Sequence, residues 1–178
     1  MGTKKYRLTG NHIDIGNRIL YQIEALKDFG NVKAGDLGGY IESEENLSQY
    51  DNAWVYGDAE VYGNAQVFGN ACVFDNARVY NDARVYDNAQ VYGDAKVYGD
   101  AEIKSTKDYI VFKNWWSSGR YFTWTRSNNM WKVGCFYGTG EELIKKAYND
   151  SEISGREYER VVRYVEEILE ENYENKEN

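Results

Sequence analysis

The stretch "ARVYNDARVYDNAQVYGDAKVYGDAEI", residues 77–103, repeats one pattern every six residues. The same period begins earlier in the chain: alanine recurs at every sixth position from Ala53 to Ala101, and an aliphatic residue follows each alanine two positions later. A period of six fits neither a helix with 3.6 residues per turn nor one long strand, whereas short strands separated by turns satisfy it. The repeat therefore predicts a parallel β-helix.

Each position of the repeat has a chemistry that suits a narrow β-helix. The alanine and the aliphatic residue are expected to point inward, because only small side chains fit where the wall of a coil turns. The pair after each aromatic residue is drawn only from glycine, aspartate and asparagine, as in Gly57-Asp58 and Asn81-Asp82. These residues tolerate positive φ and cap turns with their own side chains, so we expect them at the corners.

The unit "VYGDAE" resembles the hexapeptide pattern of left-handed β-helices, with an aliphatic residue, three variable residues and a small residue. The resemblance implies three hexads in each triangular coil, about three coils in all, and residues eighteen apart stacked at about 4.8 Å. This register places Glu60 beside Arg78 and Arg84 beside Glu102, so opposite charges adjoin. It also stacks the outward aromatic residues in three ladders: Tyr56, Phe74 and Tyr92; Tyr62, Tyr80 and Tyr98; Phe68 and Tyr86.

The chain of 178 residues is expected to be mainly β, with a cap covering the unpaired strand edges at each end of the β-helix. Residues 1–50 are predicted to form an N-terminal β cap and lead-in, where "KKYRLTG" and "ILYQIEAL" pair as strands across "NHIDIGNR". The repeats occupy residues 51–106, a three-stranded antiparallel meander 107–138, two helices 139–172 and an acidic tail 173–178. Capping-box patterns at Thr139 and Ser154 mark the expected helix starts.

Composition restricts the surroundings in which the chain works. No apolar run is long enough for a signal peptide or a bilayer span, so we expect a cytoplasmic protein with no membrane partner. Cys72 and Cys135 lie far apart without metal-site spacing and are expected to be reduced thiols. A formal net charge of −8 disfavours nonspecific binding to nucleic acid over the whole surface.

Three segments together resemble hexapeptide-repeat proteins carried by bacteriophages and prophages. They are the lead-in "IEALKDFGNVKAGDLGGYIE", the "VYGDA" coils and the ending "GCFYGTGEELIKKAYNDSEISGREY". The resemblance implies the β-helix with its small C-terminal α+β domain, a setting in the bacterial host's cytoplasm and a homo-oligomer, with a trimer favoured. It says little about activity, because function resides in sites rather than in folds.

Catalytic signatures are sparse. Related β-helix enzymes transfer acyl groups with a histidine as general base, and this chain has one histidine, His12, outside the coils. The loop that binds the acyl carrier in such enzymes is missing, as are nucleophile-elbow, P-loop and histidine-rich metal motifs. We expect no catalytic residue, no metal and no cofactor.

The meander combines cations and aromatic rings in an acidic protein. Alternation in "RYFTWTR" places Arg120, Phe122, Trp124 and Arg126 on one face, and cations beside rings suit a phosphate and a base. The candidate ligand residues are these four with Lys113, Trp115, Trp116 and Lys132. In the alternative interpretation, the tryptophans form the core of the small domain beneath the second helix, whose apolar stripe runs from Tyr158 to Leu169.

Three functions follow from these features. The first is a non-catalytic phage accessory protein that sequesters an anionic small molecule, such as a nucleotide immune signal of the host, in counter-defence. The second is an inhibitor or scaffold that binds a host or phage protein through its acidic or aromatic surface, as a mimic of nucleic acid for example. The third is a hexapeptide-type acyltransferase. In each case the eight ladder rings are candidates for an oligomer interface.

Overall fold

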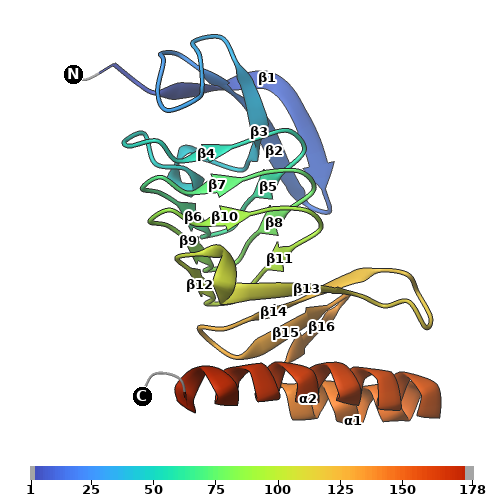
Figure 1. The fold of residues 1–178 in the computed structure, drawn as a ribbon. Helices are drawn as coiled ribbons and strands as arrows, with labels where there is room; N and C mark the ends of the chain where they lie inside the picture. The colour runs from blue at the N-terminus through green and yellow to red at the C-terminus, as the bar shows by residue number, and fades with distance from the viewer. Residues whose placement is uncertain (1–2, 175–178) are drawn as a thin grey trace.

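The computed structural model describes residues 3–174 and stacks three parts along one axis (Figure 1). An N-terminal β-hairpin covers one end of a β-solenoid, and an antiparallel sheet covers the other end. Two helices pack on the far side of that sheet. The architecture is mainly β, as the sequence predicts.

Nine strands of two residues each build the repeats. They pair in parallel in three columns, β4-β7-β10, β5-β8-β11 and β6-β9-β12. Their bounds are β4 Trp54–Val55, β5 Glu60–Val61, β6 Gln66–Val67, β7 Cys72–Val73, β8 Arg78–Val79, β9 Arg84–Val85, β10 Gln90–Val91, β11 Lys96–Val97 and β12 Glu102–Ile103. Glu60 pairs with Arg78 and Arg78 with Lys96, which confirms the coil of eighteen residues.

The lead-in adds a further turn, so the solenoid has about four turns where the repeats alone supply three. Strand β3 (Leu37–Ile41) pairs with β5 by placing Tyr40 opposite Glu60, and Leu47 bridges to Val67. The short 3₁₀ helix η1 (Glu44–Asn46) replaces a corner. There the side-chain nitrogen of the buried Asn46 donates hydrogen bonds to the Gly63 and Ala65 carbonyls, each at 2.9 Å.

Side chains fill the solenoid as the hexad pattern requires. The alanines and valines of the repeats are essentially fully buried, as is Ile103. Most corners have a residue at positive φ, which is either glycine or one of Asp75, Asn81 and Asp87. Two predicted charge contacts are present: Arg78 lies 3.0 Å from Glu60, and Arg84 lies 4.0 Å from Glu102.

The N-terminal hairpin is joined to the solenoid through β3. Strands β1 (Tyr6–Ile15) and β2 (Arg18–Ala25) are antiparallel, and β3 pairs with β2 on one side and with β5 on the other. The predicted pairing is present, but most of the expected connection is itself strand, because Gly16 at φ +62° closes a two-residue turn with Asn17. Burial lowers the pKa of Lys5 to about 8, and its ammonium donates to the Tyr50 and Ala53 carbonyls.

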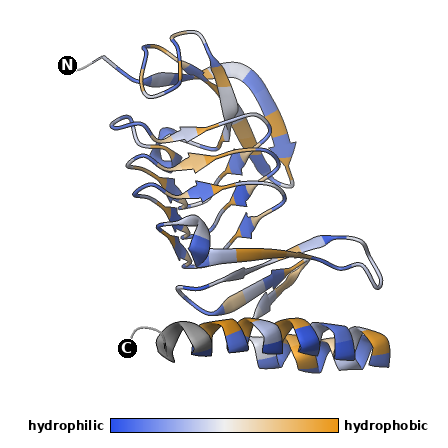
Figure 2. Ribbon diagram, in the orientation of Figure 1, coloured by the Kyte–Doolittle hydropathy of each residue, from blue (hydrophilic) through white to orange (hydrophobic). Residues whose placement is uncertain are grey.

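The C-terminal sheet has four strands instead of the expected three. They are β13 (Tyr109–Lys113), β14 (Tyr121–Thr125), β15 (Met130–Val133) and β16 (Phe136–Gly138), and the 3₁₀ helix η2 (Thr106–Asp108) precedes them. The extra strand arises because Gly134, at φ +55°, forms a two-residue turn with Cys135. Figure 2 shows β13 as a largely hydrophobic strand between the solenoid and the helices.

Helix α1 (Gly140–Asp150) begins after Thr139, whose hydroxyl accepts a hydrogen bond from the Glu142 amide, as predicted. The second start was predicted wrongly: α2 (Glu152–Glu174) begins before Ser154, whose amide donates to the Ser151 hydroxyl. Tyr158, Val162 and Val165 of the predicted stripe are buried against the sheet. Residues 175–178 of the acidic tail lie outside the described part.

None of the helices within residues 3–174 combines the length and the apolar character that a membrane span requires.

Candidate functional site

The two aromatic residues predicted to bind a ligand from β14 lie inside the protein. Phe122 and Trp124 are each about 1% exposed and pack with Trp131 beneath the two helices. The alternation argument placed them correctly on one face, but that face is the one the helices cover. Their rings therefore belong to the core of the small domain, and neither presents a surface on which a base could stack.

The neighbouring tryptophans of the β13–β14 turn divide between core and surface. Trp116 is half-buried, with its ring centre 4.9 Å from that of Tyr158. Trp115 is 73% exposed. Trp115 is therefore the more exposed of the two tryptophans at the end of the hairpin.

The four predicted cations do not gather in one place. Arg120 and Arg126 flank β14 at its two ends and are exposed. The Lys132 ammonium lies 4.4 Å from the Tyr98 ring centre at the junction with the solenoid, where burial lowers its pKa. Lys113 is exposed at the end of β13, with its ammonium 5.7 Å from the Tyr121 ring centre.

The turn between β13 and β14 is held by its own hydrogen bonds. The carboxamide oxygen of the buried Asn114 accepts from the amide and hydroxyl of Ser117, at 2.9 and 3.0 Å. The Asn114 side-chain nitrogen donates to the Tyr158 hydroxyl at 2.9 Å, which ties the turn to α2. Backbone bonds join Asn114 to Arg120 and Gly119 to Asn114. Figure 1 shows this hairpin projecting beyond the solenoid.

An open crevice of about 470 Å³ lies between the hairpin and the last coil. Its wall on the solenoid side includes Tyr92 and Asp94, and its wall on the sheet side includes Val111 and Tyr121. Tyr109 also lines the crevice, and its hydroxyl donates to the Gln90 carbonyl and accepts from the Tyr92 backbone amide. Sequence reasoning assigned Tyr92 to a ladder and did not find this crevice, because its walls come from segments that meet only after the sheet docks.

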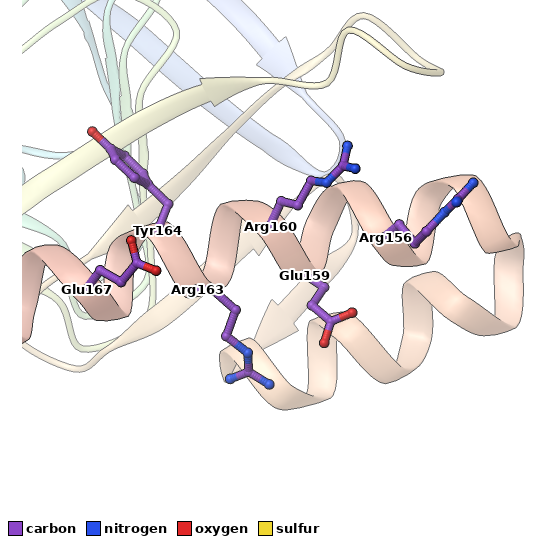
Figure 3. Close-up of a pocket in the computed structure, with 6 residues that line it drawn as sticks. All are labelled: Arg156, Glu159, Arg160, Arg163, Tyr164 and Glu167. Carbon is purple, nitrogen blue, oxygen red and sulfur yellow. The ribbon is translucent and has the colours of Figure 1, made fainter.

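A second hollow, of about 380 Å³, lies on the outer side of α2 (Figure 3). Tyr164 and Arg160 point to one side of the helix, and Arg163 points to the opposite side. The arginines already have partners: Arg160 pairs with Glu157 at 2.6 Å, and Arg163 with Glu141 and Glu166 at 2.7 and 2.8 Å. Balanced ion pairs make this surface a weak attractor for an anion.

Ring contacts along the solenoid join seven of the eight predicted ladder residues. Ring centres are 4.9 Å apart for Tyr62 and Tyr80, 5.0 Å for Phe68 and Tyr86, and 5.2 Å for Phe74 and Tyr92. Most ladder rings are half-buried by their neighbours, and the most exposed are Phe68 and Tyr92. Tyr56, at the end of its ladder, is also half-buried. Their role as an oligomer interface stays a prediction.

The longest ladder connects the two caps. Tyr98 continues from Tyr80 at 4.7 Å and reaches Tyr137 of β16 at 4.6 Å. At the opposite end, the Arg18 guanidinium lies 6.0 Å from the Tyr62 ring centre. The ladder thus joins the N-terminal hairpin, the solenoid and the C-terminal sheet through one row of contacts.

Burial of the tyrosines is expected to make the folded state less stable at alkaline pH. Burial raises the pKa of Tyr109 to about 12, and it raises the pKa of Tyr80 and Tyr6 further. The unfolded chain ionises its tyrosines near pH 10, so their contribution is complete below about pH 10 and is lost as the pH rises towards 12. We expect the buried tyrosines to ionise only as circular dichroism is lost in that interval, after the exposed tyrosines have already contributed to the absorbance. Ionisation of every tyrosine near pH 10, with the circular dichroism unchanged, would contradict this.

The single histidine and the two cysteines lie on different elements of the fold. His12 is exposed in β1, with Nδ1 3.3 Å from the Gly10 carbonyl oxygen. Cys72 is half-buried on the solenoid wall and Cys135 is exposed in the β15–β16 turn. Across the described residues, no group of three or more His, Cys, Asp or Glu side chains could hold a metal ion.

Comparison with protein families matches residues 77–93 to the repeat described as the YdcK beta solenoid repeat. The chain is a β-solenoid repeat protein. The match spans about one coil of the solenoid, so it agrees with the parallel pairing but does not extend to the hairpin or to the C-terminal sheet. No curated protein matches the chain.

Proposed function

We propose that this chain is a non-catalytic protein-binding module whose partner docks on the projecting hairpin, defined as β13, β14 and the turn 114–120 between them. The observation that carries the proposal is Trp115, which is 73% exposed on a turn fixed by Asn114. A tryptophan contributes most to binding when it is held rigidly and then buried by a partner. A free chain gains nothing in stability from exposing it.

Charge indicates the kind of partner. Residues 109–140 contain four basic residues and no acidic residue, in a chain whose net charge is −8. Two of the basic residues, Lys113 and Arg120, border the turn that carries Trp115. An acidic surface with an apolar pocket complements this arrangement, because the indole enters the pocket and the cations face its rim.

The shape of the surface favours a macromolecular partner over an enclosed small ligand. Small molecules are usually held in cavities that bury most of their surface. Here the hollows beside the hairpin and on α2 are open, and the rings expected to clamp a base are in the core.

A nucleotide remains the second candidate, favoured by one feature. Tyr92 and Tyr121 line the same crevice, and Lys113 lies beside Tyr121, so a ring and a phosphate have partners there. The resemblance to phage and prophage proteins suggests the same biological role for the protein-binding and the nucleotide-binding candidates. In that role a homo-oligomer binds a host molecule as counter-defence. Native mass spectrometry with a panel of linear and cyclic nucleotides tests this candidate separately.

Photo-crosslinking tests the protein-binding function. We replace Trp115 with benzoylphenylalanine and irradiate cells that express the protein in its natural host. A discrete crosslinked product is expected from position 115, and an added Arg120→Glu change should reduce it about tenfold through loss of charge complementarity. The matched control carries the same probe at Tyr50, which is 79% exposed and lies beside the N-terminal hairpin, where its carbonyl accepts from the Lys5 ammonium. Equal products from both positions, or none from position 115, would exclude the hairpin as the docking site.

A further inference from the structure

We propose that the free edge of β13 receives an extended segment of the partner as an additional β-strand. This inference rests on the proposed protein-binding function and specifies how the partner binds. Strand β13 is the edge of the four-stranded sheet and pairs with β14 alone among the described strands. Addition of a strand at such an edge is a common mode of peptide recognition.

The pairing register identifies the backbone groups that face outward. The Arg126 amide donates to the Asp108 carbonyl and the Asn114 amide donates to the Arg120 carbonyl, each at 2.8 Å. In an antiparallel pair, residues alternate between those that bond to the neighbour and those that point away. The backbone N–H and C=O groups of Ile110 and Phe112 therefore face β14. The backbone N–H and C=O groups of Tyr109, Val111 and Lys113 face the open side.

This edge has little of the protection that edge strands usually have. Proteins guard exposed edges with bulges, prolines, charged side chains such as lysine, or very short strands. The edge strand β1 has an irregularity between Leu8 and His12, and the edge strand β16 has three residues. By contrast, β13 presents "YIVF" without a break, and its first charge is Lys113 at its end. An unguarded edge of this kind indicates a place where another strand pairs.

The edge is flanked by side chains on both faces of the sheet. Towards the solenoid, Val111, Tyr121 and Tyr92 line the crevice. Towards α2, Tyr164 is 54% exposed and its ring centre lies 6.5 Å from that of Phe112. Figure 3 shows the Tyr164 side chain projecting from α2. Alternate side chains of an added strand would thus meet apolar and aromatic surface on each face.

Charge defines the occupant further. Lys107 precedes β13 and Lys113 ends it, and Arg120 lies across the hairpin from Asn114. The occupant that fits is an extended peptide segment with alternating apolar residues and an acidic residue next to Lys113. Asp94 on the solenoid wall disfavours a second acid at the middle of the segment.

Selection from a library of random dodecapeptides displayed on phage, with the full chain as bait, tests this proposal. We expect peptides with the alternating pattern and an acidic end, and Val111→Pro should weaken their binding by about tenfold or more because it removes an outward N–H. Val111→Ala is the control, since it shortens the side chain but keeps that N–H. N-methylation of alternate peptide bonds in a selected peptide gives the same test without altering the protein.

The outcomes separate this inference from the function on which it rests. Selected peptides that bind the Val111→Pro protein as well as the wild type, and that tolerate N-methylation, would overturn strand addition. The Trp115 crosslink could still form, and the docking site would stand. A wild-type dimer that Val111→Pro dissociates, with no peptide selected, would assign the edge to a second copy and overturn the peptide proposal. Loss of both crosslink and peptides would remove the proposed function itself.

Discussion

Replacing Gly39 with alanine is expected to lower the free energy of unfolding by about 3 kcal/mol, because the added methyl group overfills a closed site. Gly39 lies in β3, where the lead-in passes over the first coil. A Cβ there would be 2.6 Å from the Ala59 carbonyl oxygen and 2.7 Å from a Val55 methyl group. The carbonyl belongs to the solenoid backbone and cannot rotate away, so β3 must shift and weaken its pairing with β5.

Chemical denaturation monitored by circular dichroism measures this effect, and Gly10→Ala is the matched control. Gly10 is also a strand glycine, in β1 of the same sheet, but a Cβ at that position has no neighbour within 4 Å. We expect Gly10→Ala to leave stability nearly unchanged. If both substitutions had the same small effect, Gly39 of β3 would not lie as close to the first coil as described.

Replacing Trp124 with alanine is expected to cost about 4 kcal/mol, in the range for a large buried aromatic residue. The side chain is about 1% exposed and packs with Phe122 and Trp131 beneath α1 and α2. Its Nε1 also donates to the Asn129 carboxamide oxygen at 2.8 Å, in the turn between β14 and β15. Truncation leaves a cavity and removes this bond, so the sheet and helices should loosen.

Trp115→Ala is the control for this substitution, since its ring is exposed and its loss should leave the unfolding midpoint within error. Near-ultraviolet circular dichroism and thermal melting compare the two variants. The pair also separates the two sequence interpretations of the meander. A Trp124→Ala protein that melted like the wild type but lost a bound nucleotide would restore the interpretation of Trp124 as a ligand residue.

The repeats could be predicted in detail because each position has only one physical role. Alanine fits the interior at a corner, and glycine, aspartate and asparagine tolerate the positive φ of the turn. The resemblance to left-handed β-helices implied a coil of eighteen residues, and the opposite charges at Glu60 and Arg78 agreed with that register. The extra turn could not be predicted in this way, because "GGYIESEENLSQY" contains no hexad and makes its corner with the buried Asn46 amide.

The candidate site was harder to predict, because alternation shows which residues share a face but not what covers that face. Phe122 and Trp124 share a face as expected, and the helices then bury it. The predicted meander order already places the first strand, β13, at an edge of the sheet, and the structure confirms that order. The crevice beside that edge could not be predicted, because its other wall comes from the solenoid. The exposed Trp115 and the half-buried Trp116 are adjacent in sequence, and they differ because the Trp116 ring packs against Phe122 and Tyr158.

The uniform coil also sets a distance. Each eighteen-residue unit raises the chain by one strand spacing, about 4.8 Å, and returns every face to the same orientation. Whole coils gained or lost would therefore move the N-terminal hairpin along the axis without turning it relative to the β13 edge. Gain or loss of a single hexad would turn it by about a third of a revolution. The solenoid thus behaves as a spacer of adjustable length between two fixed end pieces, so spacing and recognition can change independently.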